Sequence, residues 1–155
     1  MIVNLDFLEG LSDPYIKDHC GKGYLLAGVI LGRLAWYQAR KRGSDGETAN
    51  EEGTVDEVEN MPVDLTSSPI FKQLSLGRLD KYSLKKHLSR VPKLIGDYGV
   101  HDSNRMLALL GKIMELLMMC DSDMGVDGNF AFTLGFVKWW EYYGKIFSLN
   151  TRGGE

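Results

Sequence analysis

The stretch from Lys22 to Arg42 decides the fold, and it reads KGYLLAGVILGRLAWYQARKR. Its first half is apolar on nearly every side of a helix, so we expect this helix to lie at the centre of a bundle. Gly28 and Gly32 lie one turn apart, and the absence of side chains there would let another helix approach closely. The second half becomes polar on one face, which carries Arg33, Tyr37, Arg40 and Lys41.

The segment that follows, from Gly43 to Ser68, is acidic and contains no base. It holds eight of the 21 acids of the chain, which leaves 13 acids against 18 bases elsewhere. The body of the protein therefore has a net charge of +5, although the whole chain has −3. The segment lacks aromatic residues and a sustained apolar period, so we interpret it as a flexible acidic loop inserted between helices.

The stretch from Pro69 to Tyr98 is rich in bases. When it is plotted at 100° per residue, one face is apolar and comprises Leu84, Leu88, Val91, Ile95 and Tyr98. The opposite side carries Tyr82 among six bases, namely Arg78, Lys81, Lys85, Lys86, Arg90 and Lys93. Bases around an aromatic ring suit the backbone of a polyanion, and a merely solvated helix face is the alternative. Pro92 predicts a kink or a restart of the helix.

Two further helices are expected. Ser103 can cap a helix from Asn104 to Met119, which we expect to be buried on most sides because its polar stripe is narrow. Asp127 or Asn129 can cap the last helix, which extends to about Phe147 and supplies mainly aromatic core residues. One polar face of that last helix carries Lys138, Tyr142 and Lys145.

No stretch shows the alternation typical of a strand, and no internal repeat is apparent. We therefore predict an all-α fold, a bundle of four to five helices. At 155 residues the chain is long enough to bury one substantial core, so we predict a single domain over residues 1–155, with the acidic loop at residues 43–68.

The sequence offers no signature of a catalytic or metal site. Cys20 and Cys120 form no framework of the secreted kind, and we expect them to be reduced thiols in a cytoplasm. The three histidines lack zinc-ligand spacing, and the aspartates between Cys120 and Asn129 lack the glycine and glutamate of a calcium loop. No P-loop, nucleophile elbow or dinucleotide fingerprint occurs, so we predict a non-enzyme with no catalytic residue, metal or cofactor. No signal peptide or membrane-spanning run is evident, which favours a cytoplasmic protein away from membranes.

The order of these features resembles a known family. The helix from Gly23 to Arg42 is followed by SPIFKQLSLGRLDKYSLKKHL at residues 68–88 and by NFAFTLGFVKWWEYY at residues 129–143. Together they resemble the C-terminal helical region of the large subunit of type I-B CRISPR Cascade complexes. They also look like the small subunit that such genes can produce separately from an internal start codon. The motifs GVILGRL and FTLGF carry the likeness, and the Met1 start with the compact length favours the separate small subunit.

The resemblance implies a non-catalytic small subunit of a crRNA-guided antiviral complex that stabilises the target-bound state. Its implied partners are the large subunit, the backbone subunits, further copies of itself, crRNA and target DNA. Such a subunit contacts nucleic-acid backbones without reading their sequence, because base pairing performs the reading. Our candidate contact residues are Arg33, Arg40, Lys41, Arg78, Lys81, Lys85, Lys86, Arg90, Lys93, Lys138 and Lys145. The alternative is a helical protein-interaction module with an exposed aromatic patch around Trp139 and Tyr143.

Overall fold

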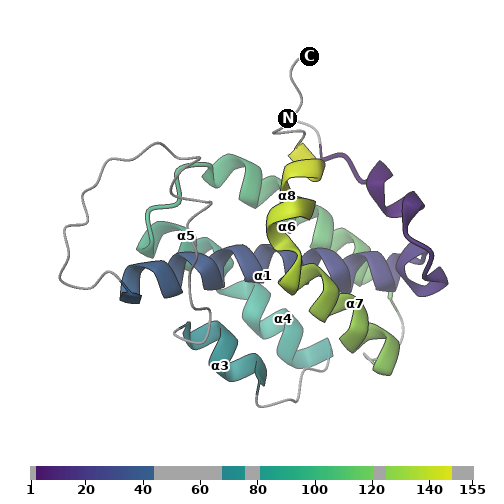
Figure 1. The fold of residues 1–155 in the computed structure, drawn as a ribbon, viewed down its shortest axis with the longest axis horizontal. Coiled ribbons are helices and arrows are strands. Elements are labelled where there is room, and N and C mark those ends of the chain that lie inside the picture. Colours follow the sequence, from purple (N-terminus) through teal and green to yellow (C-terminus); the bar gives the residue numbers. More distant parts are fainter. Residues whose placement is uncertain (1–2, 44–67, 76–80, 121–124, 148–155) are drawn as a thin grey trace.

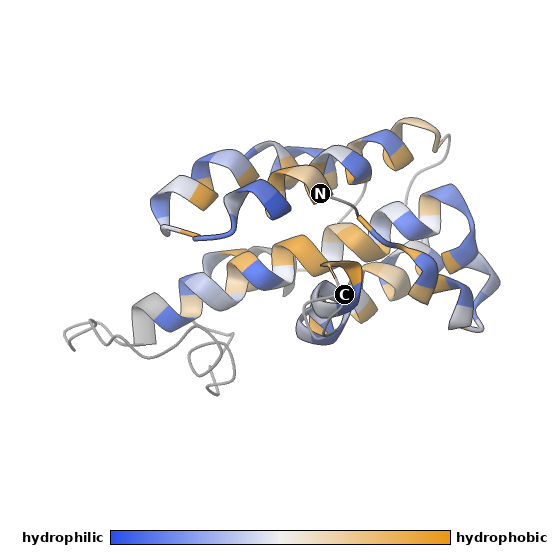
Figure 2. Ribbon diagram, turned by 90° about the horizontal axis from the view of Figure 1, so that it is seen from above, coloured by the Kyte–Doolittle hydropathy of each residue, from blue (hydrophilic) through white to orange (hydrophobic). Residues whose placement is uncertain are grey.

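Helix α1 (His19–Gly43) runs through the middle of the molecule, and the other helices pack around it (Figure 1). The computed structural model describes residues 3–43, 68–75, 81–120 and 125–147. Within those ranges it contains helices and turns but no strand, which confirms the all-α prediction. Every residue of α1 from 23 to 36 is buried. The prediction of a central helix is therefore confirmed, and Figure 2 shows α1 becoming hydrophilic toward its Gly43 end.

The other described elements surround α1 in chain order. They are η1 (Asp6–Gly10), η2 (Pro14–Lys17), α3 (Pro69–Ser75), α4 (Lys81–Ser89), α5 (Val91–Asp97), α6 (Ser103–Met118), α7 (Val126–Val137) and α8 (Trp139–Phe147). The acidic segment lies almost wholly outside the described residues.

Helices α1 and α7 pack at a contact that only glycine permits. A Cβ atom at Gly28 would lie 2.1 Å from the carbonyl oxygen of Phe132, and one at Gly135 would lie 2.0 Å from that of Leu25. A Cβ atom at Gly32 would lie 2.8 Å from the carbonyl oxygen of Phe136. These separations are far below van der Waals contact, so the two helix backbones approach each other directly. The close approach predicted from Gly28 and Gly32 is confirmed.

Helix α3 is fixed to α1 through a buried serine. The backbone N–H groups of Ile70 and Phe71 donate to the hydroxyl of Ser68 at 3.1 and 3.2 Å, which caps the first turn of α3. The Ser68 hydroxyl in turn donates to Oε1 of Gln38 on α1 at 2.6 Å. This capped contact returns the chain to the bundle after the acidic segment.

The basic stretch forms two short helices rather than one. Helix α4 ends at Ser89, and α5 begins at Val91 with Pro92 in its first turn, where a missing N–H group costs no hydrogen bond. The restart predicted at Pro92 is therefore confirmed. The predicted apolar face is confirmed as well, because Leu84, Leu88, Val91 and Ile95 are all buried.

One expectation about the later helices is confirmed and two are wrong. Helix α6 is buried or half-buried on most sides, because its exposed residues, which include Leu107 and Met118, lie on one narrow stripe. Its N-cap position is held by Asp102 rather than Ser103. The last helix is divided at Lys138 into α7 and α8, because the chain must turn there to keep both segments against α1.

The expectation of reduced cysteines is also wrong. Cys20, at the start of α1, forms a disulfide with Cys120, which follows α6, and the two Cα atoms lie 5.1 Å apart. The bond joins residues 100 positions apart, so it removes much freedom from the unfolded chain. Disulfides are typical of proteins that meet an oxidising environment, so this bond does not favour the expected cytoplasmic location.

Candidate nucleic-acid interface

Helix α4 presents bases on its solvent side. We call Tyr82, Lys85, Lys86 and the adjoining Arg90 the α4 basic face; all four are exposed, and Tyr82 is 74% exposed. The helix forms because Leu84 and Leu88 anchor its opposite side in the core, which leaves the bases facing water. Among the residues that the structure describes, no carboxylate forms an ion pair with Lys85, Lys86 or Arg90. Their charges are therefore available to an external anion.

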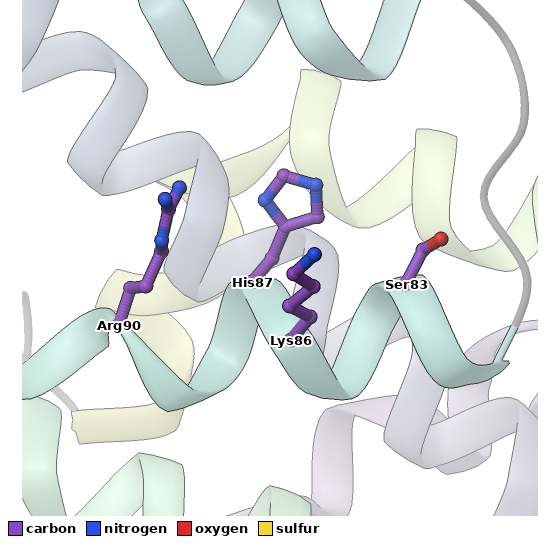
Figure 3. Close-up of a pocket in the computed structure, with 4 residues that line it drawn as sticks. All are labelled: Ser83, Lys86, His87 and Arg90. Atoms are coloured by element: carbon purple, nitrogen blue, oxygen red, sulfur yellow. The ribbon is translucent and has the colours of Figure 1, made fainter.

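A pocket of about 220 Å³ lies along the flank of α4. It is lined by Ser83, Lys86, His87 and Arg90, whose side chains project from the same side of the helix (Figure 3). Their spacing of i, i+3, i+4 and i+7 places them in one row on an α-helix. A smaller cavity continues from His87 and Arg90 inward to Leu31 and Gln38 of α1 and to Ile70 of α3.

Burial and two neighbouring positive charges act on His87. Burial lowers the pKa of its imidazole, and the charges of Arg90 and Lys86 lower that pKa further. The sequence prediction missed His87 and Ser83, because neither is a permanent base and neither has zinc-ligand spacing. The helical spacing of these polar residues was the available signal, but the adjoining cavity is formed with residues of α1 and α3, which lie far away in sequence.

Arg33 is not part of any surface patch, and its assignment as an exposed contact residue is wrong. Its side chain is 1% exposed, and Nη2 donates to both carboxylate oxygens of Asp102, at 3.0 and 3.1 Å. The Tyr143 hydroxyl donates to the same carboxylate, and the guanidinium carbon lies 4.2 Å from the centre of the Tyr143 ring. Arg33 thus joins α1 to the start of α6 and to α8.

The charges of this buried cluster support one another. Burial on its own would raise the pKa of the Asp102 carboxyl, but the Arg33 charge and the hydrogen bonds from Tyr143 and Arg33 lower it overall. Burial raises the pKa of the Tyr143 hydroxyl, and the Asp102 carboxylate raises it further against the opposing charge of Arg33. Asp102 is therefore ionised and Tyr143 neutral at neutral pH, so the cluster holds one ion pair and one phenol donor.

The remaining candidate bases are less available than those of α4. Lys93 pairs with Asp97 at 2.8 Å, while Lys138 and Lys145 flank Glu141 at 3.9 and 3.3 Å. Exposed pairs of this kind are weak, but each acid offsets part of the local positive charge.

Arg40 and Tyr142 are less exposed than the sequence predicts. Arg40 is half-buried, with its guanidinium carbon 5.6 Å from the centre of the Trp36 ring. The prediction that Tyr142 shares a polar surface with Lys138 and Lys145 is wrong, because Tyr142 is buried against Phe7. Arg78 and the side chains of Lys41 and Lys81 lie outside the described part of the chain.

The aromatic patch of the alternative function lies elsewhere than expected. Trp139 and Tyr143 are buried, so they form no surface patch. Exposed apolar residues occur instead on α7 and at the start of α8, and they are Val126, Phe130, Val137 and Trp140. The first three lie on one side of α7 by their helical spacing.

Comparisons with known proteins give no assignment: no family model, curated protein or solved structure matches the chain. Within the described ranges, no group of three or more His, Cys, Asp or Glu residues is arranged to hold a metal ion. None of the helices in those ranges is long and apolar enough to cross a membrane.

Proposed function

We propose that this protein binds nucleic-acid backbones without reading their sequence and acts as the small subunit of a crRNA-guided antiviral complex. The observation that carries the binding half is the α4 basic face, where Lys85, Lys86 and Arg90 are exposed and have no acidic partner among the described residues. Phosphate groups are the ligands that such unpaired, solvent-facing bases attract, whatever the base sequence.

The anchoring of α4 supports this function. Its buried leucines pack the helix against the core, so the backbone positions of the bases follow helical spacing on the outer side. Tyr82 can stack on a base or cover the alkyl stem of a neighbouring lysine. A fixed row of charges gives affinity and shape complementarity, and base pairing with the guide supplies the sequence specificity.

The assignment to a Cascade complex is supported by the sequence resemblance alone. The two motifs that carry it, GVILGRL and FTLGF, meet at the glycine contact between α1 and α7. They are therefore structural motifs, and they indicate the fold more than the ligand. The proposed partners remain the large subunit, the backbone subunits, further copies of the chain, crRNA and target DNA.

Nucleic-acid binding is tested with the full chain and several labelled oligonucleotides of unrelated sequence, both single-stranded and duplex. We expect similar affinities for all sequences of one form, and affinity that falls linearly with the logarithm of the salt concentration. Strong discrimination between sequences, or no binding at low salt, would contradict the proposal. The proposed role in a Cascade complex is tested by adding the chain to a type I-B complex purified without its small subunit. The measurement is the retention of target DNA by that complex.

A second candidate, a helical protein-interaction module, is favoured by the exposed apolar residues of α7. Such residues are enriched at protein contacts when they lie together on one surface. If the protein is such a module, the parent protein should bind no nucleic acid. Phe130→Gln should then abolish its association with a partner protein. In the proposed small subunit, by contrast, the same variant should still bind oligonucleotides like the parent.

A further inference from the structure

The pocket on the flank of α4 differs from the rest of the basic face because its side chains line a shared space. Lys85 and Tyr82 point to open solvent and do not line it, whereas Lys86 and Arg90 do. Its volume of about 220 Å³ exceeds the roughly 10–15 Å³ that a single water needs on this scale, so it can admit a group of several atoms.

The lining groups favour a ligand that accepts hydrogen bonds and has no donor of its own. Lys86 offers an ammonium group and Arg90 a planar fork of N–H donors, while a protonated His87 donates from both ring nitrogens. No carboxylate lines the pocket among the described residues. A phosphate group, which has several oxygen acceptors and a negative charge, matches this set, and arginine binds it through two parallel hydrogen bonds.

A second cavity adjoins the pocket. His87 and Arg90 also border this small cavity, whose other lining residues are Leu31, Gln38, Pro69, Ile70 and Leu94. Gln38 accepts from the Ser68 hydroxyl and from the backbone N–H of Ile70, which holds α3 against α1. His87 therefore lies between mainly apolar side chains and the basic pocket, and electrostatic attraction is stronger there than in open water.

The charge state of His87 depends on what occupies the pocket. Among the described residues, the charged groups that face it are Lys86 and Arg90. The side chains that border the same cavity from α1, α3 and α5 do not titrate; they are Leu31, Gln38, Pro69, Ile70 and Leu94. An anion among these groups would counter the two positive charges and favour the imidazolium ion.

We propose that the pocket lined by Ser83, Lys86, His87 and Arg90 binds one phosphate group. The inference rests on the proposed function for its source, which is an internal phosphodiester of the bound nucleic acid; a terminal or free phosphate has the same chemistry. It adds His87 to the binding residues and separates the role of Lys86 from that of Lys85, its neighbour in sequence.

The test is an NMR titration of the histidine ring protons of the full chain between pH 5 and 8, with His87→Gln to assign the His87 signal. The four samples contain no ligand, sulfate, a short single strand with a 5′-hydroxyl, and the same strand with a 5′-phosphate. Sulfate serves as the free anion because its charge is constant over this range. Lys86→Ala is the pocket variant, and Lys85→Ala is the matched control, since it removes the same charge from the same helix outside the pocket.

We expect the 5′-hydroxyl strand to raise the pKa of His87 by about one unit or more in the parent and in Lys85→Ala, but not in Lys86→Ala. Lys86→Ala should weaken strand binding about tenfold, and Lys85→Ala clearly less. A rise with the 5′-phosphorylated strand alone would identify a terminal phosphate as the ligand and would overturn the internal phosphodiester.

The remaining outcomes separate this inference from the proposed function. Salt-sensitive strand binding with an unchanged His87 pKa would overturn the phosphate pocket and leave the proposed function standing. A rise with sulfate in the absence of any strand binding would support the pocket and overturn the nucleic-acid function. An unchanged pKa together with no strand binding would overturn both.

Discussion

Arg33 and Arg90 hold positive charge in two different ways. Arg33 is buried at the crossing of α1, α6 and α8, where the Asp102 carboxylate and the Tyr143 ring surround it. Arg90 is exposed at the end of α4, beside Lys86 and without an acidic partner among the described residues. A buried charge must find its counter-ion inside the protein, whereas an exposed one is free to take it from a ligand. The first arginine therefore depends on its buried partner within the fold, and the second is suited to binding.

The largest effect should follow removal of the buried counter-ion. Asp102→Asn leaves the Arg33 charge uncompensated in the interior, and we expect the free energy of unfolding to fall by about 3–5 kcal/mol. Urea denaturation measures this loss. Asp97→Asn, which removes the exposed partner of Lys93, is the matched control and should cost no more than about 1 kcal/mol. Equal losses of unfolding free energy in the two variants would contradict the distinction between buried and exposed charge.

The pH dependence of stability in acid should show the contribution of the same buried ion pair. The pKa of Asp102 is lower in the folded protein than in the unfolded chain, so its contribution to stability is complete above the unfolded value and is lost as the pH falls through the folded value. Denaturation curves of the parent protein and Asp102→Asn should therefore differ most at neutral pH and converge in strong acid. A difference between the two that stays constant down to about pH 2, below the usual range of a carboxyl pKa, would mean that Asp102 does not stabilise the fold as a carboxylate.

His87 should give a smaller effect in a higher pH range. Its folded pKa is below the unfolded value, so protons bind the unfolded chain preferentially and stability falls as the pH drops from about 6.5 toward the folded value. We expect His87→Gln to remove this part of the pH dependence, because glutamine does not bind a proton in this range. Thermal unfolding of the two proteins at pH 7 and pH 5 tests this, and identical pH dependence would contradict the burial of His87.

The smallest effect on stability per substitution should come from the α4 basic face. Lys85, Lys86 and Arg90 make no ion pair among the described residues, so replacing all three by alanine should change the free energy of unfolding by no more than about 0.5 kcal/mol per residue. Urea denaturation of the triple variant gives the value. A loss as large as that of Asp102→Asn would show that these bases belong to the fold.

Local patterns in the sequence are sufficient to predict much of this architecture. Gly28 and Gly32 predicted the close helix contact, and the apolar face of α4 with the restart at Pro92 follows from helical spacing. These features depend on neighbours within one or two turns, which periodicity reveals directly.

Contacts between distant parts of the chain were not predictable in this way. Arg33 meets Asp102 across 69 residues, and Cys20 meets Cys120 across 100. The sequence shows that Arg33 shares a helix face with Tyr37, but it does not show that another helix covers that face. The pocket beside α4 is an intermediate case, because its four lining residues follow helical spacing, whereas the cavity that adjoins it is lined mainly by residues of α1 and α3.

The most direct test of backbone binding by α4 compares the salt dependence of single-strand binding in three proteins. They are the parent, the triple variant Lys85→Ala, Lys86→Ala, Arg90→Ala, and a charge-matched control with Lys17, Lys22 and Lys112 replaced by alanine. We predict that the triple variant folds normally and that its plot of log affinity against log salt is shallower by about one unit for each phosphate that the protein no longer neutralises, with the same change for every strand sequence. The control should keep the slope of the parent. A folded triple variant with an unchanged slope would contradict the claim that α4 binds the backbone.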